Sequence, residues 1–232
     1  MSKLTREELD HFTGNLQYRL KLLAQTRQHT DRLLATRFNV FFEYIRPNEN
    51  LLSDVIKNLN NPNGDHGQGE AFLKEFIETM CGPTPPPWKF LSIHRENATS
   101  LIENHRRRMD VLIDLDSFGI AIENKPWADE QKDQIHDYVA HLERRFVGKF
   151  VIVYLSPDGA EPTSIGKALR KRLLHEKKLV LSAYRGRFHE WLERCYRVCA
   201  AEKVRWFLYD FMVYAEQTFS AEKEVITEPD DE

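Results

Sequence analysis

The chain has 232 residues, of which 41% are hydrophobic and 30% charged, and its formal net charge is −3. These proportions are typical of a globular protein and exclude a fibre or a wholly disordered chain. No run reaches the ~20 apolar residues that a membrane span needs, and the N-terminal "MSKLTREELDHF" is too polar for a signal peptide. The cysteines are odd in number and form no CxxC pair, which favours neither a disulfide framework nor a zinc site. We therefore expect a soluble, cytoplasmic protein without a membrane partner.

The first third of the chain is expected to be helical. In residues 3–45, apolar side chains recur at spacings of three and four, which predicts one long helix. Pro47 ends it, because the residue before a proline avoids helical geometry. A second helix is expected to begin near Asn48 or Asn50, since either side chain can cap it. After the turn-rich "NNPNGDHGQG", the 3.6-residue period of "EAFLKEFIETMC" predicts a third helix.

The middle of the chain alternates between predicted strands and helices. Four short runs rich in Ile, Leu and Val are expected to be strands: "KFLSIHREN", "RMDVLIDL", "FGIAIENK" and, after a helix over "ADEQKDQIHDYVAHLERRF", the continuously apolar "KFVIVYLSP". The continuous apolar run is typical of a strand covered on both faces. The order predicts a mixed sheet with helices packed on it.

The C-terminal part begins with "SIGKALRKRLLHEKK", which is either a helix or a basic loop, and "LVLSAY", a short strand. Two amphipathic helices with aromatic faces follow over "RFHEWLERCYRVC" and "EKVRWFLYDFMVYAEQTF". Trp127, Trp191 and Trp206 are expected to be core anchors. The acidic "EVITEPDDE" is expected to be disordered.

Charged residues in two neighbouring strands share one face. Side chains alternate along a strand, so a hairpin with a two-residue loop at Ser117 and Phe118 places Asp110 across from Lys125. A register one pair shorter places Asp110 directly across from Glu123. Both registers put the two carboxylates and the lysine on one face, whereas a slip of one residue would scatter them.

Two carboxylates within ~5 to 8 Å repel each other unless a cation lies between them. Mg²⁺ fits, because it is typically held by one or two carboxylates together with phosphate oxygens. Lys125 could then orient a metal-bound water or meet the charge that grows on a phosphate. Gly119 and Ala121 on the same face would leave room for a nucleic-acid backbone. The competing interpretation is a partly exposed sheet face in which Glu123 and Lys125 form a weak salt bridge.

These residues occur in a motif order that resembles the PD-(D/E)XK nuclease superfamily, with its D, ExK and QxxxY motifs. The D motif is Met109-Asp110, which lacks the proline of the name. The other two motifs follow on the next strand and the next helix: Glu123-Asn124-Lys125, then Gln134 and Tyr138.

The segment "NENLLSDVIKNLNNPNGDHGQGEAFLKEFIE" resembles the entry segment of a prokaryotic branch of this superfamily. In that branch a helix-borne Glu, here Glu49, precedes a loop containing Pro and His-Gly, here with His66. The resemblance extends from about Asn48 to about Phe219. For His66 we expect a role in the loop rather than in catalysis.

The resemblance implies an α/β fold: a restriction-endonuclease-like core (αβββαβ), with a mixed central sheet flanked by helices, plus a long N-terminal helix and C-terminal helices. It also implies three parts of the chain. An N-terminal helical segment spans 1–46, a nuclease-like domain spans 47–220, and the acidic tail spans 221–232.

The resemblance implies that Asp110, Glu123 and the backbone carbonyl of Asn124 hold a divalent ion, Mg²⁺ or Mn²⁺. Lys125 would position the attacking water, and Glu49 would bind the metal directly or through water. The alternative for Glu49 is a solvent-facing residue in the first turn of a helix, stabilised by the helix dipole.

The resemblance implies that Gln134 orients groups of the site or contacts a phosphate. Tyr138 would contact the nucleic-acid backbone or support its helix against the sheet, and its place in an apolar stripe favours packing. Arg106, Arg107 and Arg108 precede the D motif and could bind phosphates, or could protect a sheet edge.

The implied function is a divalent-metal-dependent endonuclease, acting on DNA rather than RNA, with a role in restriction, repair or antiviral defence. The alternative is a catalytically silent module that uses the fold to bind nucleic acid or protein. A homodimer formed through the N-terminal helix is also expected.

Overall fold

The computed structural model describes residues 6–35, 38–82, 87–98, 108–127 and 133–219. The chain divides into two compact units, Met1–Tyr44 and Ile45–Glu232, and each is described by itself. No helix in the described ranges combines the length and the apolar character needed to cross a membrane.

The first unit is built on the long helix α1, Arg6–Leu34. A short π-helical turn, η1 (Phe41–Ile45), includes the last residues of this unit. The expectation of one helix through residue 45 is wrong. The α-helix ends at Leu34 because Ala35 has a φ of 47°, in the left-handed region. Leu16, Leu20 and Leu23, which carried the helical period, are 46–65% exposed, so the period predicted the helix but not a core.

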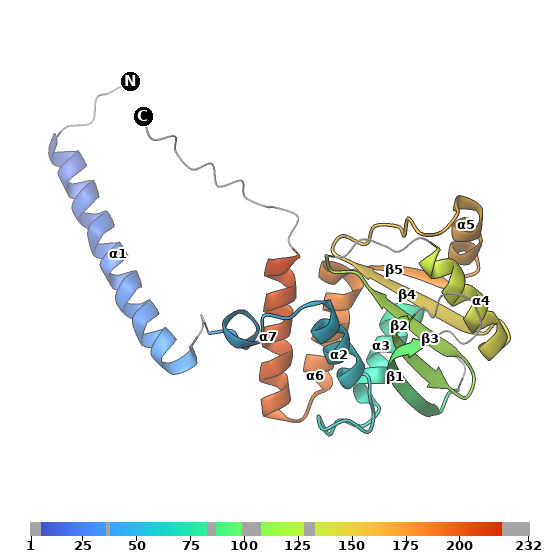
Figure 1. The fold of residues 1–232 in the computed structure, drawn as a ribbon. Helices are drawn as coiled ribbons and strands as arrows, with labels where there is room; N and C mark the ends of the chain where they lie inside the picture. The colour runs from blue at the N-terminus through green and yellow to red at the C-terminus, as the bar shows by residue number, and fades with distance from the viewer. Residues whose placement is uncertain (1–5, 36–37, 83–86, 99–107, 128–132, 220–232) are drawn as a thin grey trace. The chain divides into compact units, whose positions relative to one another are not determined.

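The second unit contains a five-stranded sheet in the order β1-β2-β3-β4-β5 (Figure 1). The strands are Phe90–Ala98, Arg108–Leu115, Gly119–Asn124, Phe150–Ser156 and Leu179–Ala183. The first three pair antiparallel, and β3, β4 and β5 pair parallel. The parallel strands are connected through α4 (Gln134–Phe146) and α5 (Lys167–His175). This mixed sheet confirms the expected fold class, and "SIGKALRKRLLHEKK" contains a helix.

The hairpin between β2 and β3 takes the shorter of the two registers. Val111 pairs with Ile122 and Asp114 with Gly119. The backbone N–H of Leu115 donates to the carbonyl of Phe118 at 3.0 Å, which closes a two-residue loop between them. Continuing this register by one pair brings the D motif opposite the glutamate of the ExK motif.

Helices cover both faces of the sheet (Figure 1). On one face α2 (Glu49–Leu59) contacts β1, β2 and β3, while α3 (Ala71–Cys81) contacts β5 and α6 (His189–Val198), and α6 packs on α7 (Glu202–Thr218). On the other face α4 and α5 enclose an apolar cluster with the strands that includes Leu112, Ala121, Ile135, Val139, Leu142, Ile152 and Leu173. The side chain of Asn48 accepts the N–H of Leu51 at 2.9 Å and so caps α2, as one of the two expected caps.

Only one of the three tryptophans expected in the core is buried. Trp191 is fully buried, and its indole N–H donates to the carbonyl of Phe72 at 3.1 Å. Trp127 and Trp206 are 54% and 55% exposed, so the expectation is wrong for both. Trp206 lies on α7 beside, rather than within, the stripe that is buried. The helical period identifies a stripe but not its borders.

Candidate functional site

The D and ExK motifs meet at the carboxyl end of β3. Glu123 and Asn124 are its last two residues, and Asp110 lies near the start of the neighbouring β2. Two helices begin at this end of the sheet, α2 with Glu49 and α4 with Gln134. Glu49 accepts a hydrogen bond from Lys125 of the ExK motif, and Gln134 donates one to Glu123. Because helix N-termini carry partial positive charge, both helices favour carboxylates here.

Glu123 is the most buried charged residue of the site, with a side chain only 1% exposed. Its Oε1 accepts from the Nζ of Lys125 at 2.8 Å and from the Nε2 of Gln134 at 2.6 Å. Its Oε2 is buried and has no hydrogen-bond partner among the described residues. An unsatisfied buried oxygen costs about 1–3 kcal/mol, more when charged, so this atom is suited to a ligand.

Both carboxyl groups hold a proton more tightly than usual. Burial, and after it the charge of Asp110, raise the pKa of Glu123 to about 8 against the opposing effect of Lys125. Burial also raises the pKa of Asp110 to about 6, against the effect of the Asn124 N–H, which donates to its Oδ2 at 2.8 Å. Desolvation therefore dominates over the lysine, and a cation could relieve it.

Lys125 links two carboxylates. Its Nζ lies 2.8 Å from Glu123 and 3.2 Å from the Oε1 of Glu49. Burial lowers the pKa of this lysine, but the charges of Glu123, Asp110 and Glu49 outweigh burial and raise it, so the ammonium form persists. Glu49 does lie in the first turn of α2, yet its side chain is paired with Lys125 rather than turned only to solvent.

The side chain of Asn124 forms a buried polar network that the sequence did not indicate. Its Nδ2 donates to the Oγ of Ser53 at 3.0 Å, and Ser53 donates to the carbonyl of Glu49 at 3.0 Å. Its Oδ1 accepts from the hydroxyl of Tyr184 at 2.5 Å. Asn124 and Tyr184 are fully buried, and Ser53 is 2% exposed. The network ties α2 and the end of β5 to the ExK motif.

The QxxxY pair lies under the site rather than on its surface. The Nε2 of Gln134 is 2.9 Å from the hydroxyl of Tyr138, which donates to the carbonyl of Arg108 at 2.6 Å. Gln134 is 6% and Tyr138 1% exposed. Gln134 thus contacts Glu123 directly, and Tyr138 occupies the packing position, not a surface that nucleic acid could reach. Arg108 itself is exposed at the start of β2, while Arg106 and Arg107 lie outside the described residues.

The small residues Gly119 and Ala121 do not leave room for nucleic acid, contrary to expectation. A Cβ on Gly119 would lie 2.2 Å from the ring of Phe146, and Ala121 is buried in the cluster under α4. The helix that follows β3 therefore fills this face at Gly119 and Ala121.

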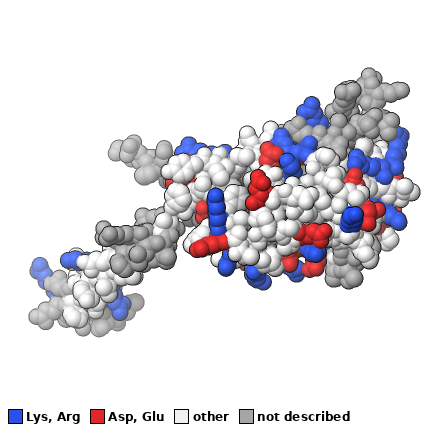
Figure 2. Space-filling view, turned by 90° about the horizontal axis from the view of Figure 1, so that it is seen from below, with Lys and Arg blue, Asp and Glu red and all other residues white. Residues whose placement is uncertain are grey.

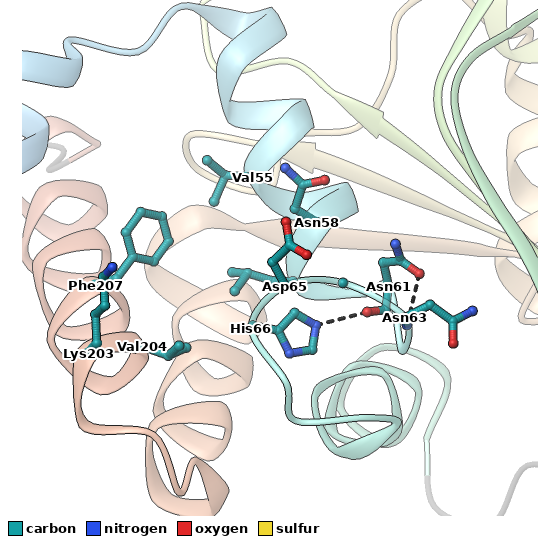
Figure 3. A pocket seen from close by; sticks show the side chains of 11 residues that line it. Val55, Asn58, Asn61, Asn63, Asp65, His66, Lys203, Val204 and Phe207 are labelled. Atoms are coloured by element: carbon teal, nitrogen blue, oxygen red, sulfur yellow. Dashed lines mark hydrogen bonds between the residues drawn. The ribbon is translucent and has the colours of Figure 1, made fainter.

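His66 has a role in its loop, as expected. Its Nε2 hydrogen-bonds with the carbonyl of Asn61 at 2.9 Å, and its ring stacks on Phe72 with centroids 5.0 Å apart. The loop forms part of a pocket of about 530 Å³ that Lys203 and Phe207 of α7 also line (Figure 3). None of the D, ExK or QxxxY residues lines this pocket.

The donor set fits a hard divalent cation. Within the described ranges, no three His, Cys, Asp or Glu side chains are grouped as a metal site. Mg²⁺ does not need three, since one or two carboxylates with water and phosphate oxygens hold it. Asp110 and Glu123 offer these carboxylates, and the unpartnered Oε2 is a ready ligand atom.

Comparison with curated proteins found no match, and neither did comparison with solved structures. Comparison with known protein families found the PD-(D/E)XK nuclease superfamily over residues 38–213. This range covers three quarters of the chain and every residue of the site described above. The motifs that meet at the end of β3 are therefore those of a family whose members are generally metal-dependent nucleases, and the chain belongs to the PD-(D/E)XK nuclease superfamily.

Proposed function

We propose that the protein is a divalent-metal-dependent nuclease that hydrolyses phosphodiester bonds with a metal-activated water. One observation carries the proposal: a buried glutamate oxygen without a partner, next to a second carboxylate of raised pKa and a paired lysine. A sheet face with only a structural role gains nothing from this arrangement, because it costs stability.

The proposed roles rest on the superfamily motifs and are supported by the contacts of Glu123 and Lys125. Asp110, Glu123 and the backbone carbonyl of Asn124 would hold Mg²⁺ or Mn²⁺, with Glu49 binding directly or through water. When bound, the ion supplies a Lewis acid and lowers the pKa of a coordinated water. Lys125, held as an ammonium between two carboxylates, orients the attacking water and meets the charge developing on the phosphate.

Gln134 acts through Glu123. Its amide donates to the Oε1 of that glutamate at 2.6 Å, which fixes the carboxylate and leaves Oε2 for the ion. Such support of a ligand by a second group is typical of metal sites. This contact supports a positioning role for Gln134 in preference to phosphate contact.

The substrate that we propose is DNA, cleaved internally, in restriction, repair or antiviral defence. Membership of the superfamily supports this proposal. We also propose residues 47–220 as the catalytic domain and the N-terminal helix as a dimerisation segment.

A metal-dependent cleavage assay tests the activity on supercoiled DNA, linear DNA, single-stranded DNA and RNA. Asp110→Asn, Glu123→Gln and Lys125→Met should each reduce cleavage by about two to three orders of magnitude or more, as loss of transition-state charge stabilisation does. Asp114→Asn is the matched control. It lies on the same face of β2 but pairs with Arg145, so cleavage should stay at the wild-type rate.

Two results would contradict the proposal: cleavage that persists in excess chelator, or cleavage that persists in all three site variants. Either would mean that the activity does not arise from these residues.

The second candidate is a catalytically silent module that binds nucleic acid or protein. It is supported by the lysine ammonium that bridges the carboxylates and by the lack, within the described ranges, of a ready three-residue metal cluster. Calorimetric titration with Mg²⁺ and Mn²⁺ separates the two candidates. Absence of metal binding, with and without DNA, would favour the module.

A further inference from the structure

The site itself repels the substrate that we propose for it. Asp110, Glu123 and Glu49 surround a single ammonium, Lys125, and the chain as a whole carries a net charge of −3. Basic and acidic side chains are interspersed on the face shown in Figure 2 and form no single basic field. Cations placed beside the site would supply affinity for a phosphodiester backbone.

The carboxyl end of β5 carries two such cations. The strands β3, β4 and β5 are parallel, so their carboxyl ends lie at the same edge of the sheet as the ExK motif. The short turn η2, Tyr184–Phe188, follows β5 directly with the sequence "YRGRF". Arg185, Gly186 and Arg187 are all exposed. Ligands commonly bind at this edge of sheets with parallel strands.

Both ends of this turn are anchored in the core. At its start, the hydroxyl of Tyr184 donates to Asn124 at 2.5 Å, and its ring stacks on Phe219 with centroids 4.0 Å apart. At its end, Phe188 is buried with its ring 5.3 Å from that of Trp191. The two arginines are therefore displayed by a segment that is hydrogen-bonded to the ExK motif itself.

Two acidic residues, one close along the chain and one after the neighbouring strand, have partners of their own. Glu190 pairs with Arg194 at 3.3 Å. Asp158, on the loop that follows β4, accepts the N–H of Ala160 at 2.9 Å. Within the described part of the chain, Arg185 and Arg187 form no ion pair, so their charge is available to a ligand.

We propose that Arg185 and Arg187 bind backbone phosphates of the nucleic acid beside the scissile bond. This rests on the proposed nuclease function and adds to it the residues that hold the substrate. Arginine suits the role, because its planar fork binds phosphate oxygens in pairs. Contacts of this kind set affinity and register on the backbone but read no sequence.

The test measures binding of a short labelled duplex DNA in chelator, over a series of salt concentrations. Arg185→Ala and Arg187→Ala should each weaken binding and lower the slope of log K against log salt by about one, and the double variant by about two. In the metal-dependent assay KM should rise while kcat at saturation changes little. Melting temperatures should match the wild type, since both side chains are exposed.

Arg197→Ala is the matched control, because Arg197 is an exposed arginine of α6 that pairs with Glu193 at 3.4 Å. It should leave the salt slope and KM unchanged. Single-stranded DNA and RNA of the same length serve as further arms, and the same loss on all three would support recognition of the backbone alone.

The inference is overturned if the double variant keeps the wild-type salt slope and KM while the wild type cleaves. Failure of the proposed function has a different signature, namely a wild type that cleaves no substrate with any divalent ion. If the wild type cleaves nothing but its DNA binding still depends on both arginines, the inference on phosphate binding stands and the proposed nuclease activity is excluded.

Discussion

The two ends of the β2–β3 hairpin hold charged side chains in opposite ways. At the end with the ExK motif, the side chains of Glu123 and Lys125 are 1% and 9% exposed, and one glutamate oxygen has no partner. At the end near the turn, Arg145 pairs with Asp114 at 2.5 Å, with side chains 35% and 17% exposed. Nearby, Lys178 pairs with Glu143 at 3.1 Å at the surface.

The difference separates structural charges from functional ones. Partly exposed pairs such as Lys178 with Glu143 lose little hydration and contribute little to the free energy of unfolding, so a structural role is enough to account for them. Burying Glu123 beside Asp110 costs stability, which the raised pKa of each carboxyl group records. A fold tolerates such a cost where the charges perform a function.

The largest effect that we expect is a loss of stability of the metal-free protein with rising pH. The ordinary pKa of Glu123 is 4.5 and its folded value is about 8, while Asp110 rises from 3.8 to about 6. Between these values the folded state binds more protons than the unfolded state. The free energy of unfolding should therefore fall, by up to about 1.4 kcal/mol per pH unit for each group. Urea unfolding in chelator at a series of pH values measures it.

Glu123→Gln should flatten this dependence above about pH 7, because Asp110, whose pKa is about 6, is largely ionised there. Added Mg²⁺ should stabilise the wild-type protein most at high pH, because the ion competes with protons for the same oxygens. Glu143→Gln, at the other end of the sheet, is the control and should keep the wild-type dependence. An unchanged pH dependence in Glu123→Gln would show that this carboxyl group does not titrate as its burial predicts.

An intermediate effect is expected from the network under the ExK motif. Tyr184→Phe removes the donor to Asn124 Oδ1 and leaves that atom buried without a partner, so the free energy of unfolding should fall by about 1–3 kcal/mol. Cleavage should also fall through kcat, because Asn124 helps to fix the end of β3. Chemical unfolding and steady-state kinetics measure the two effects.

Tyr209→Phe is the control for this network, since Tyr209 is a half-exposed tyrosine of α7. Its effect should stay within about 0.5 kcal/mol, as for most surface substitutions. Equal unfolding free energies for the two variants would contradict the assignment of Tyr184 as an anchor.

Much of the site could be predicted from the sequence because strand periodicity is local. Alternation placed Asp110, Glu123 and Lys125 on one face and left two registers open. The bond between Leu115 and Phe118 decides between them, and it depends on the turn geometry rather than on the pattern.

The rest of the site depends on contacts between distant parts of the chain. Ser53 and Tyr184 reach Asn124 across separations of 71 and 60 residues, and no local pattern carries that information. The same holds for Gly119, where the sequence predicted free space for a ligand. In the fold, the ring of Phe146 fills that space. Similarly, the helical period of α7 did not show that Trp206 lies outside the buried stripe.

The smallest effect is expected at the surface pair that completes the comparison. Lys178→Met keeps the side-chain stem and removes the charge beside Glu143, and it should change the free energy of unfolding by less than about 1 kcal/mol. High salt should reduce even this change, and cleavage should not respond. A double-mutant cycle with Glu143→Gln measures the coupling without the other effects of either substitution.

The same double-mutant cycle on Lys125 and Glu123 compares the coupling energy of this buried pair with that of the exposed pair. Removing one partner of a buried pair leaves an uncompensated charge, which typically costs about 3–5 kcal/mol, whereas an exposed pair couples by about 0.2–1 kcal/mol. The variant Lys125→Met should therefore be far more destabilised above pH 8, where Glu123 is ionised, than below it. Coupling of equal size at the two ends would mean that burial does not distinguish them, and the charge cluster at the end of β3 would then be no more than a surface ion pair.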